Sequence, residues 1–165
     1  MRKLLLVFCL ALSVPGFAAD LVVGEAAPDV EAKLLDGATK VRVADNSGKV
    51  TIINFWATWC EPCREEMPAI DAYYKKHRAS GLEVLAISLD DANDAAAVRK
   101  FAQKYSFPVA LKSDANFKGL GRIWRLPSTF VIDKRGILRK NGLVGEPKVD
   151  LALLESLVTP LLKAP

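Results

Sequence analysis

Cysteine and histidine are scarce in this chain, whose 165 residues contain three cysteines and one histidine. A zinc site needs about four Cys, His or acidic ligands at suitable spacing, and His77 has no such partners nearby, so we expect no metal site. Disulfides that stabilise a fold by closing long loops are excluded too. The two cysteines that lie close together, Cys60 and Cys63, would close a loop too small to stabilise a domain.

The chain also lacks an apolar run long enough to cross a membrane, which takes about 20 residues. Its N-terminal apolar run, Leu4–Val14, has 11 residues, follows Arg2 and Lys3, and precedes the small residues of Pro15–Ala19. This pattern predicts a secretory signal peptide over residues 1–18, with cleavage after Ala19 as the alternative. We therefore expect a soluble protein in the periplasm or another exported compartment.

Without residues 1–18, the chain has no large excess of charge of either sign. The remaining residues, 19–165, contain 21 basic and 19 acidic side chains, and no basic run is interleaved with aromatics. This balance predicts no nucleic-acid partner. The length fits one domain with a sizeable core, and we expect it to be a monomer.

The most informative stretch that is present is Trp59-Cys60-Glu61-Pro62-Cys63. It follows an apolar run over 50–56 and opens a charged, helix-prone segment over 61–80, which predicts a strand that turns into a helix. Cys60 then lies at the helix N-terminus, where free N–H groups and the macrodipole favour a thiolate. Cys63 lies one turn further on the same face. The pattern predicts a dithiol that closes and opens as a disulfide.

Strand-like and helix-like patterns alternate along the rest of the chain. We expect a hairpin over 30–43, strands over 82–89 and 108–111, a helix over 94–105, a short helix or turn over 116–123, paired strands over 128–133 and 137–144, and a final helix from Pro147 with Leu151, Leu154, Leu157 and Leu161 facing the core. This order predicts an α/β fold with a central mixed β-sheet, helices on both faces and an N-terminal β-hairpin extension.

Two motifs carry a family resemblance. The first spans Asn54–Cys63, the second spans Leu126–Asp133, and Gly24–Asp29 supplies a matching entry segment. Together they resemble the thioredoxin-fold family, and more narrowly the exported thiol–disulfide oxidoreductases of the TlpA/ResA type. The resemblance extends from Gly24 to about Leu162, and it implies that residues 19–165 form a thioredoxin-like domain.

The resemblance also implies further site residues. Pro127 would follow a cis peptide bond and, with Trp59, form an apolar platform beside the two sulfurs. Leu126 would offer its backbone to an extended substrate strand, and Trp124 would contact the substrate as well. Arg125 stands where the family often has glycine, and either directs the protein to acidic partners or is simply solvated.

A proton acceptor is harder to assign. Cytoplasmic thioredoxins have a buried aspartate on the central strand, and the matching position here is Asn54, which does not titrate. The resemblance points to an acidic residue after the next strand, which is Asp91 or its neighbour Asp90. An equally open alternative is that both residues cap the following helix.

These residues predict dithiol–disulfide exchange without a cofactor. Cys60 attacks a disulfide of a partner, and Cys63 resolves the mixed disulfide. Glu61 disfavours the adjacent thiolate, so we expect a reductant. The resemblance implies exported proteins with disulfides as substrates, in cytochrome c maturation for example, and a membrane thiol-transfer protein as electron donor.

Two other functions remain open at this stage. The first is a copper-handling module, because Cys-x-x-Cys thiolates are soft ligands, although a third ligand is missing. The second is a thiol peroxidase, indicated by Thr58 two residues before Cys60, although the expected upstream proline is missing.

Overall fold

The computed structural model describes residues 21–164. The expected signal peptide over residues 1–18 lies outside this part of the chain, as does the domain boundary that it sets. Between residues 21 and 164, none of the helices has the length and apolar character needed to cross a membrane.

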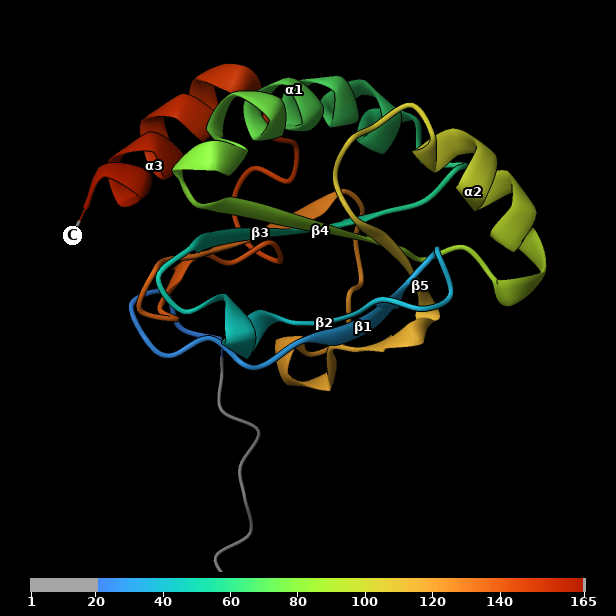
Figure 1. Ribbon diagram of the computed structural model, residues 1–165, viewed down its shortest axis with the longest axis horizontal. Coiled ribbons are helices and arrows are strands. Elements are labelled where there is room, and N and C mark those ends of the chain that lie inside the picture. The colour runs from blue at the N-terminus through green and yellow to red at the C-terminus, as the bar shows by residue number, and fades with distance from the viewer. Residues whose placement is uncertain (1–20, 165) are drawn as a thin grey trace, which may run out of the picture.

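A seven-stranded mixed sheet forms the centre of the molecule, with the order β2-β1-β5-β4-β3-β6-β7 (Figure 1). Its strands are β1 Glu31–Leu34, β2 Lys40–Arg42, β3 Val50–Trp56, β4 Leu82–Ser88, β5 Val109–Asn116, β6 Ser128–Ile132 and β7 Leu138–Lys140. The neighbours β3, β4 and β5 run parallel, and the remaining pairs are antiparallel. Every residue of β3 is buried, as its continuous apolar sequence predicts for a strand covered on both faces.

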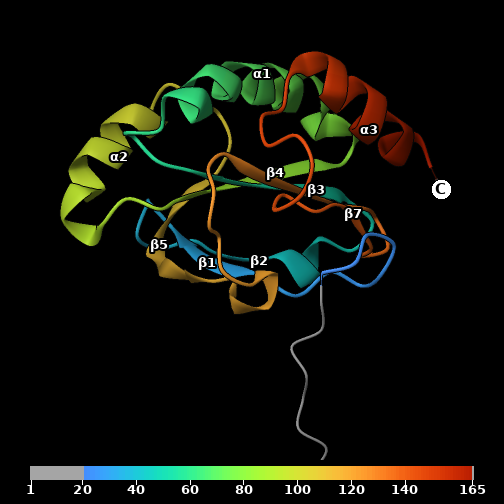
Figure 2. The ribbon, with the colours of Figure 1, turned by 180° about the vertical axis from the view of Figure 1, so that it is seen from behind.

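Three α-helices cover one face of the sheet: α1 Glu61–His77, α2 Ala95–Ala102 and α3 Leu151–Lys163 (Figures 1 and 2). The β3–α1–β4 and β4–α2–β5 connections step in the same direction across the sheet, so right-handed crossovers place both helices on the same face. All three helices accordingly contribute to one apolar cluster, through Met67, Val98 and Leu154 among others.

The second face has a different cover from the one expected. No α-helix of the described chain packs there, and the helical cover consists of two 3-10 helices, η1 Val43–Asn46 and η4 Lys118–Leu120 (Figure 1). Leu120, Phe117 and Leu21 pack against the residues of β3 and β4 that point to this side, such as Phe55 and Ile87. The expectation of helices on both faces therefore holds for this face only through short 3-10 helices.

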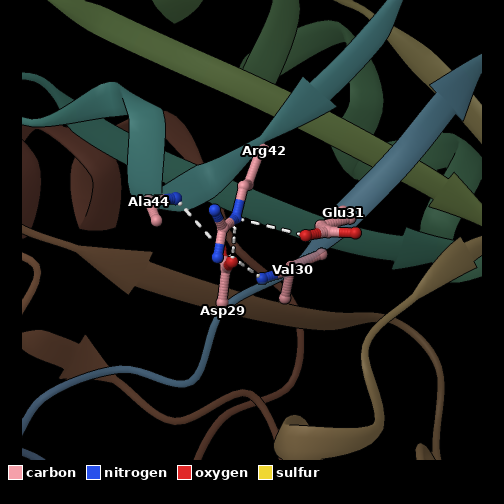
Figure 3. Close-up of polar contacts among 5 residues, drawn as sticks. All are labelled: Asp29, Val30, Glu31, Arg42 and Ala44. Carbon is pink, nitrogen blue, oxygen red and sulfur yellow. Dashed lines mark hydrogen bonds and ion pairs between the residues drawn. The ribbon is translucent and has the colours of Figure 1, made fainter.

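The β1–β2 hairpin confirms the predicted N-terminal extension, and Asp29 fastens it. The Asp29 carboxylate accepts hydrogen bonds from the backbone N–H groups of Val30 and Ala44 and from the guanidinium of Arg42, which also pairs with Glu31 at 3.2 Å (Figure 3). The contacts of Asp29 with Arg42 and Ala44, and of Glu31 with Arg42, join the start of β1 to the end of β2 and the residues just after it. They fix the hairpin at the edge of the sheet.

Some predicted boundaries differ from the observed ones. β5 extends to Asn116, and α3 begins at Leu151, because the side chain of Asp150 caps it by accepting from the Leu153 N–H. Leu154, Val158 and Leu162 form the buried stripe of α3, and Leu151 is exposed. The prediction that Leu151 faces the core was therefore wrong.

Candidate active site

Cys60 and Cys63 are joined by a disulfide at the point where β3 leads into α1, with their Cα atoms 5.3 Å apart. Cys60 is the N-cap of α1, and its Sγ accepts a hydrogen bond of 3.3 Å from the Cys63 N–H. A free helix N–H stabilises negative charge on that sulfur. Cys63 is fully buried and Cys60 is 6% exposed, so Cys60 is the sulfur that a partner reaches first.

The loop that leads to Cys60 is held by Asp90. The Asp90 carboxylate, which is buried, accepts from the Thr58 N–H at 2.9 Å, the Thr58 hydroxyl at 2.5 Å and the Ser88 hydroxyl at 2.6 Å. Trp56 and Ser88 are paired at the carboxyl ends of two parallel strands, where loops meet at one edge of the sheet. Asp90 thereby fixes the backbone just ahead of Trp59 and Cys60.

Asp91 has another environment. Its side chain is 78% exposed and accepts a hydrogen bond of 2.8 Å from Lys112 on β5. This hydrogen bond lowers the pKa of Asp91, which makes the carboxylate a poorer proton acceptor. The helix-capping alternative fails as well, because the Asp91 side chain makes no cap hydrogen bond to the 3-10 helix η3, Ala92–Asp94. The structure thus brings Asp90, and not Asp91, to the cysteine loop.

Sequence reasoning missed Glu66, a buried carboxylate one turn after Cys63 on α1. Its Oε1 accepts from the Asn54 side chain at 2.7 Å, and its Oε2 accepts from the Val149 N–H at 2.8 Å. Burial raises the pKa of Glu66 to about 7, against the opposing effect of these hydrogen bonds and of Lys140 and Lys148.

Asn54 stands at the position that matches the buried aspartate of cytoplasmic thioredoxins, and Glu66 is hydrogen-bonded to it. The available signal was the helical spacing, since Glu66 falls next to Met67 on the inward face of α1, where a charged residue is unusual. A carboxylate with a pKa near neutrality beside a buried thiol can take up and release a proton.

The peptide bond between Leu126 and Pro127 is cis, as predicted. Phe55 of β3 pairs with Ser128 of β6, and continuing this antiparallel register places Pro127 opposite Trp56. The residues ahead of β6 therefore lie beside the end of β3 from which the cysteine loop departs. Trp124, on this segment, is 64% exposed, and Trp59, on the cysteine loop, is 69% exposed.

The chain is similar to known proteins in both sequence and fold. Residues 23–141 match the AhpC/TSA family. The chain belongs to this family. Among AhpC/TSA relatives, the thiol-disulfide oxidoreductase ResA of Bacillus cereus is 33% identical over 150 residues, which cover 88% of this chain and 85% of ResA.

Solved structures agree with this family assignment. A Chlorobium tepidum protein described as a thiol:disulfide interchange protein DsbE superposes with a TM-score of 0.72 at 30% identity, covering 87% of this chain and 99% of its own. StoA from Bacillus subtilis superposes with a TM-score of 0.61 at 26% identity, covering 80% and 98%. These likenesses confirm the thioredoxin fold and the ResA-type resemblance.

The contrast between Asp90 and Asp91 in this AhpC/TSA chain gives a testable expectation. We expect Asp90→Asn to lower the free energy of unfolding by about 1–3 kcal/mol, because an amide leaves one buried donor unpaired. We also expect it to slow insulin reduction severalfold by loosening the loop before Cys60. Asp91→Asn is the matched control and should change neither quantity, since exposed ion pairs contribute little. Urea unfolding and insulin turnover test this, and an effect of Asp91→Asn as large as that of Asp90→Asn would contradict it.

Proposed function

We propose that this protein is a thiol–disulfide oxidoreductase that reduces disulfides in exported partner proteins. The observation that carries the proposal is the Cys60–Cys63 pair at a helix N-terminus, with Cys60 the more accessible and Cys63 fully buried one helical turn before Glu66. Insulin reduction in the presence of dithiothreitol tests it. We expect a rate well above that of dithiothreitol alone, and an equal rate would refute the proposal.

The mechanism has two exchange steps. In the first, the Cys60 thiolate attacks one sulfur of the partner disulfide, which forms a mixed disulfide and releases the other partner sulfur as a thiolate that takes up a proton. In the second, Cys63 gives its proton to Glu66 and attacks Cys60 Sγ. The Cys60–Cys63 bond forms, and the mixed disulfide breaks and releases the remaining partner sulfur as a thiolate that takes up a proton. Two electrons have then passed to the partner.

The substrate surface follows from the exposed groups around Cys60. We assign Trp59 and Trp124 to apolar contacts with the partner, because large exposed aromatic side chains are typical of contact surfaces. Leu126 is assigned to main-chain pairing with an extended segment, and Pro127 to the wall beside the sulfurs. Asp91, with its partner Lys112, has no part in this scheme.

Glu61 sets the direction of electron flow in this proposal. Its carboxylate lies between the two cysteines in sequence and opposes charge on the Cys60 sulfur, which favours the closed disulfide and makes the dithiol a reductant. We expect Glu61→His to raise the reduction potential by about 10–30 mV, because a thiolate beside a cationic side chain is stabilised. Equilibration with glutathione measures this, and a potential that is unchanged or lower contradicts the role of Glu61.

The pathway is the finer part of the proposal. The pattern of residues 1–18 supports export to the periplasm or an equivalent compartment, where a reductant needs an electron source. We assign that role to a membrane thiol-transfer protein, with apocytochrome c cysteines as candidate targets and a monomer as the working form. A Cys63→Ser variant that traps partners as mixed disulfides identifies the substrates directly.

Two alternative functions have distinct tests. A copper-handling module needs further ligands near the cysteines, and no group of three Cys, His, Asp or Glu side chains suited to a metal occurs between residues 21 and 164. Stoichiometric Cu(I) binding without insulin reduction would favour it. For a thiol peroxidase, Thr58 is the relevant residue, and its hydroxyl is engaged by Asp90. Rapid peroxide consumption would favour this alternative.

A further inference from the structure

Arg125 is hydrogen-bonded to the backbone of a neighbouring loop. Its side chain is half-buried and its guanidinium donates to the carbonyl of Gly142 from Nε at 3.1 Å and from Nη2 at 2.8 Å. Nη1 donates to the carbonyl of Gly145 at 3.0 Å. Three hydrogen bonds from one planar fork fix both ends of a short backbone segment, which a lysine ammonium does not reproduce.

The segment that Arg125 holds is the loop between β7 and α3, residues 141–149, and its far end touches α1. The Val149 N–H donates to Glu66, and Lys148 pairs with Glu65 at 2.6 Å. At the near end, a Cβ added to Gly142 would lie 2.8 Å from the Thr129 nitrogen, so this part of the loop is pressed against β6. The loop therefore connects the segment before Pro127 with the helix that carries both cysteines.

We propose that Arg125 is a positioning residue: by holding the 141–149 loop, it keeps the Val149 N–H on the Glu66 carboxylate and so tunes the proton acceptor of the second exchange step. The inference rests on the thiol–disulfide exchange proposed above. It is independent of which partner the protein reduces, because the second step takes place within the chain.

The electrostatics of Glu66 give the direction of the effect. The groups that act on it are Asn54 from β3, the Val149 N–H, and the cations Lys140 and Lys148. Cys63 lies one turn earlier on the same helix. Burial raises the pKa of Glu66, and the Val149 hydrogen bond opposes that rise. Loss of this bond raises the pKa further, so a smaller fraction of Glu66 is ionised at pH 7 and the second step slows there.

The test uses the full exported chain and 5,5′-dithiobis(2-nitrobenzoate) as the disulfide. Mixed with an equimolar amount of reduced protein, it gives one thionitrobenzoate when Cys60 attacks, and a second when Cys63 resolves the mixed disulfide. We expect Arg125→Ala to leave the first phase unchanged and to move the pH midpoint of the second phase upward. An upward shift of about one unit from 7 slows that phase about fivefold at pH 7.

Two matched variants distinguish the loss of the Arg125 hydrogen bonds from the loss of its positive charge. Arg122→Ala removes the same charge three residues away, from an exposed side chain for which the described chain shows no hydrogen bond, and should leave both phases as in the unsubstituted protein. Arg125→Lys keeps the positive charge but lacks the planar guanidinium, and we expect the pH midpoint of its second phase to rise as well. A midpoint equal to that of the unsubstituted protein in Arg125→Lys and Arg125→Ala overturns the inference.

A structural readout covers the case in which Arg125→Ala folds poorly. In Arg125→Lys we expect faster deuterium exchange at the Val149 amide, with unchanged exchange in β3. Equal protection at Val149 overturns the inference as well. If the unsubstituted protein gives no second phase at all, then the proposed exchange itself fails. That outcome is distinct from a failure of the positioning role proposed for Arg125.

Discussion

Cys60→Ser should lower the rate of insulin reduction by at least about a thousandfold, because a serine hydroxyl at neutral pH is not a nucleophile toward disulfides. Cys60 is the N-cap of α1 and the more exposed of the two sulfurs, so no other group of the described site replaces it. The measurement is the turnover of insulin under dithiothreitol, with folding checked by circular dichroism.

Cys63→Ser is the matched control for this prediction. It retains the attacking sulfur and lacks the resolving one, so a single exchange should occur and the partner should remain attached to Cys60. Mass spectrometry of the complex distinguishes the two variants. Insulin reduction that survives in Cys60→Ser, or a partner bound through Cys63, would remove the proposed mechanism.

Glu66→Gln should slow the resolving step by about a hundredfold at pH 8 while leaving the first attack by Cys60 intact, since a positioned base contributes about that much or more. The rate of the resolving step in the unsubstituted protein should rise with pH around a midpoint near 7, which is the raised pKa of Glu66. In the variant this midpoint should vanish. The two-phase release of thionitrobenzoate measures both steps in one experiment.

Glu65→Gln provides the control for the same helix turn. Glu65 is exposed and its pKa is lowered by the hydrogen bond from Lys148, so its titration lies far below neutrality. Its removal should leave the pH profile of the resolving step unchanged. If Glu65→Gln and Glu66→Gln slowed that step equally, the carboxylate near Cys63 would act only through the general charge of the helix.

The raised pKa of Glu66 also has a consequence for stability. The folded protein retains the proton up to about pH 7, whereas the unfolded chain loses it near the ordinary value of 4.5. Between these values the folded state binds more protons, so the free energy of unfolding falls as the pH rises, by about 3 kcal/mol from this group. Urea unfolding at pH 4.5 and pH 8 should show this decrease, and Glu66→Gln should lack it.

What the sequence predicts well here is local. The strand–helix junction at Cys60, the helix from Glu61 and the β1–β2 hairpin each follow from a short pattern, and the structure confirms them. The cis bond before Pro127 followed from the resemblance. Each of these features is set by a few neighbouring residues and by chain geometry.

What the sequence predicts poorly depends on distant contacts. The sequence left Asp90 and Asp91 both open as proton acceptor, and their different surroundings depend on Lys112 of β5, which pairs with an exposed Asp91, and on Thr58, which bonds to a buried Asp90. Glu66 was missed because its burial requires Val149, which is 83 residues away in the chain. The cover of the second face by the 3-10 helices η1 and η4 likewise depends on how the crossovers fold, which periodicity does not encode.

The complete burial of Cys63 has a consequence for oxidative damage. Once the pair is reduced, peroxide reaches the sulfur of Cys60 before that of Cys63, and its first product is a sulfenic acid on Cys60. A second thiol one helical turn away condenses with that sulfenic acid and expels water, which returns the protein to its ordinary disulfide form before irreversible overoxidation. The buried thiol of Cys63 thus also protects Cys60. Oxidation of the more accessible sulfur ends in the disulfide form, from which the normal reducing cycle restarts.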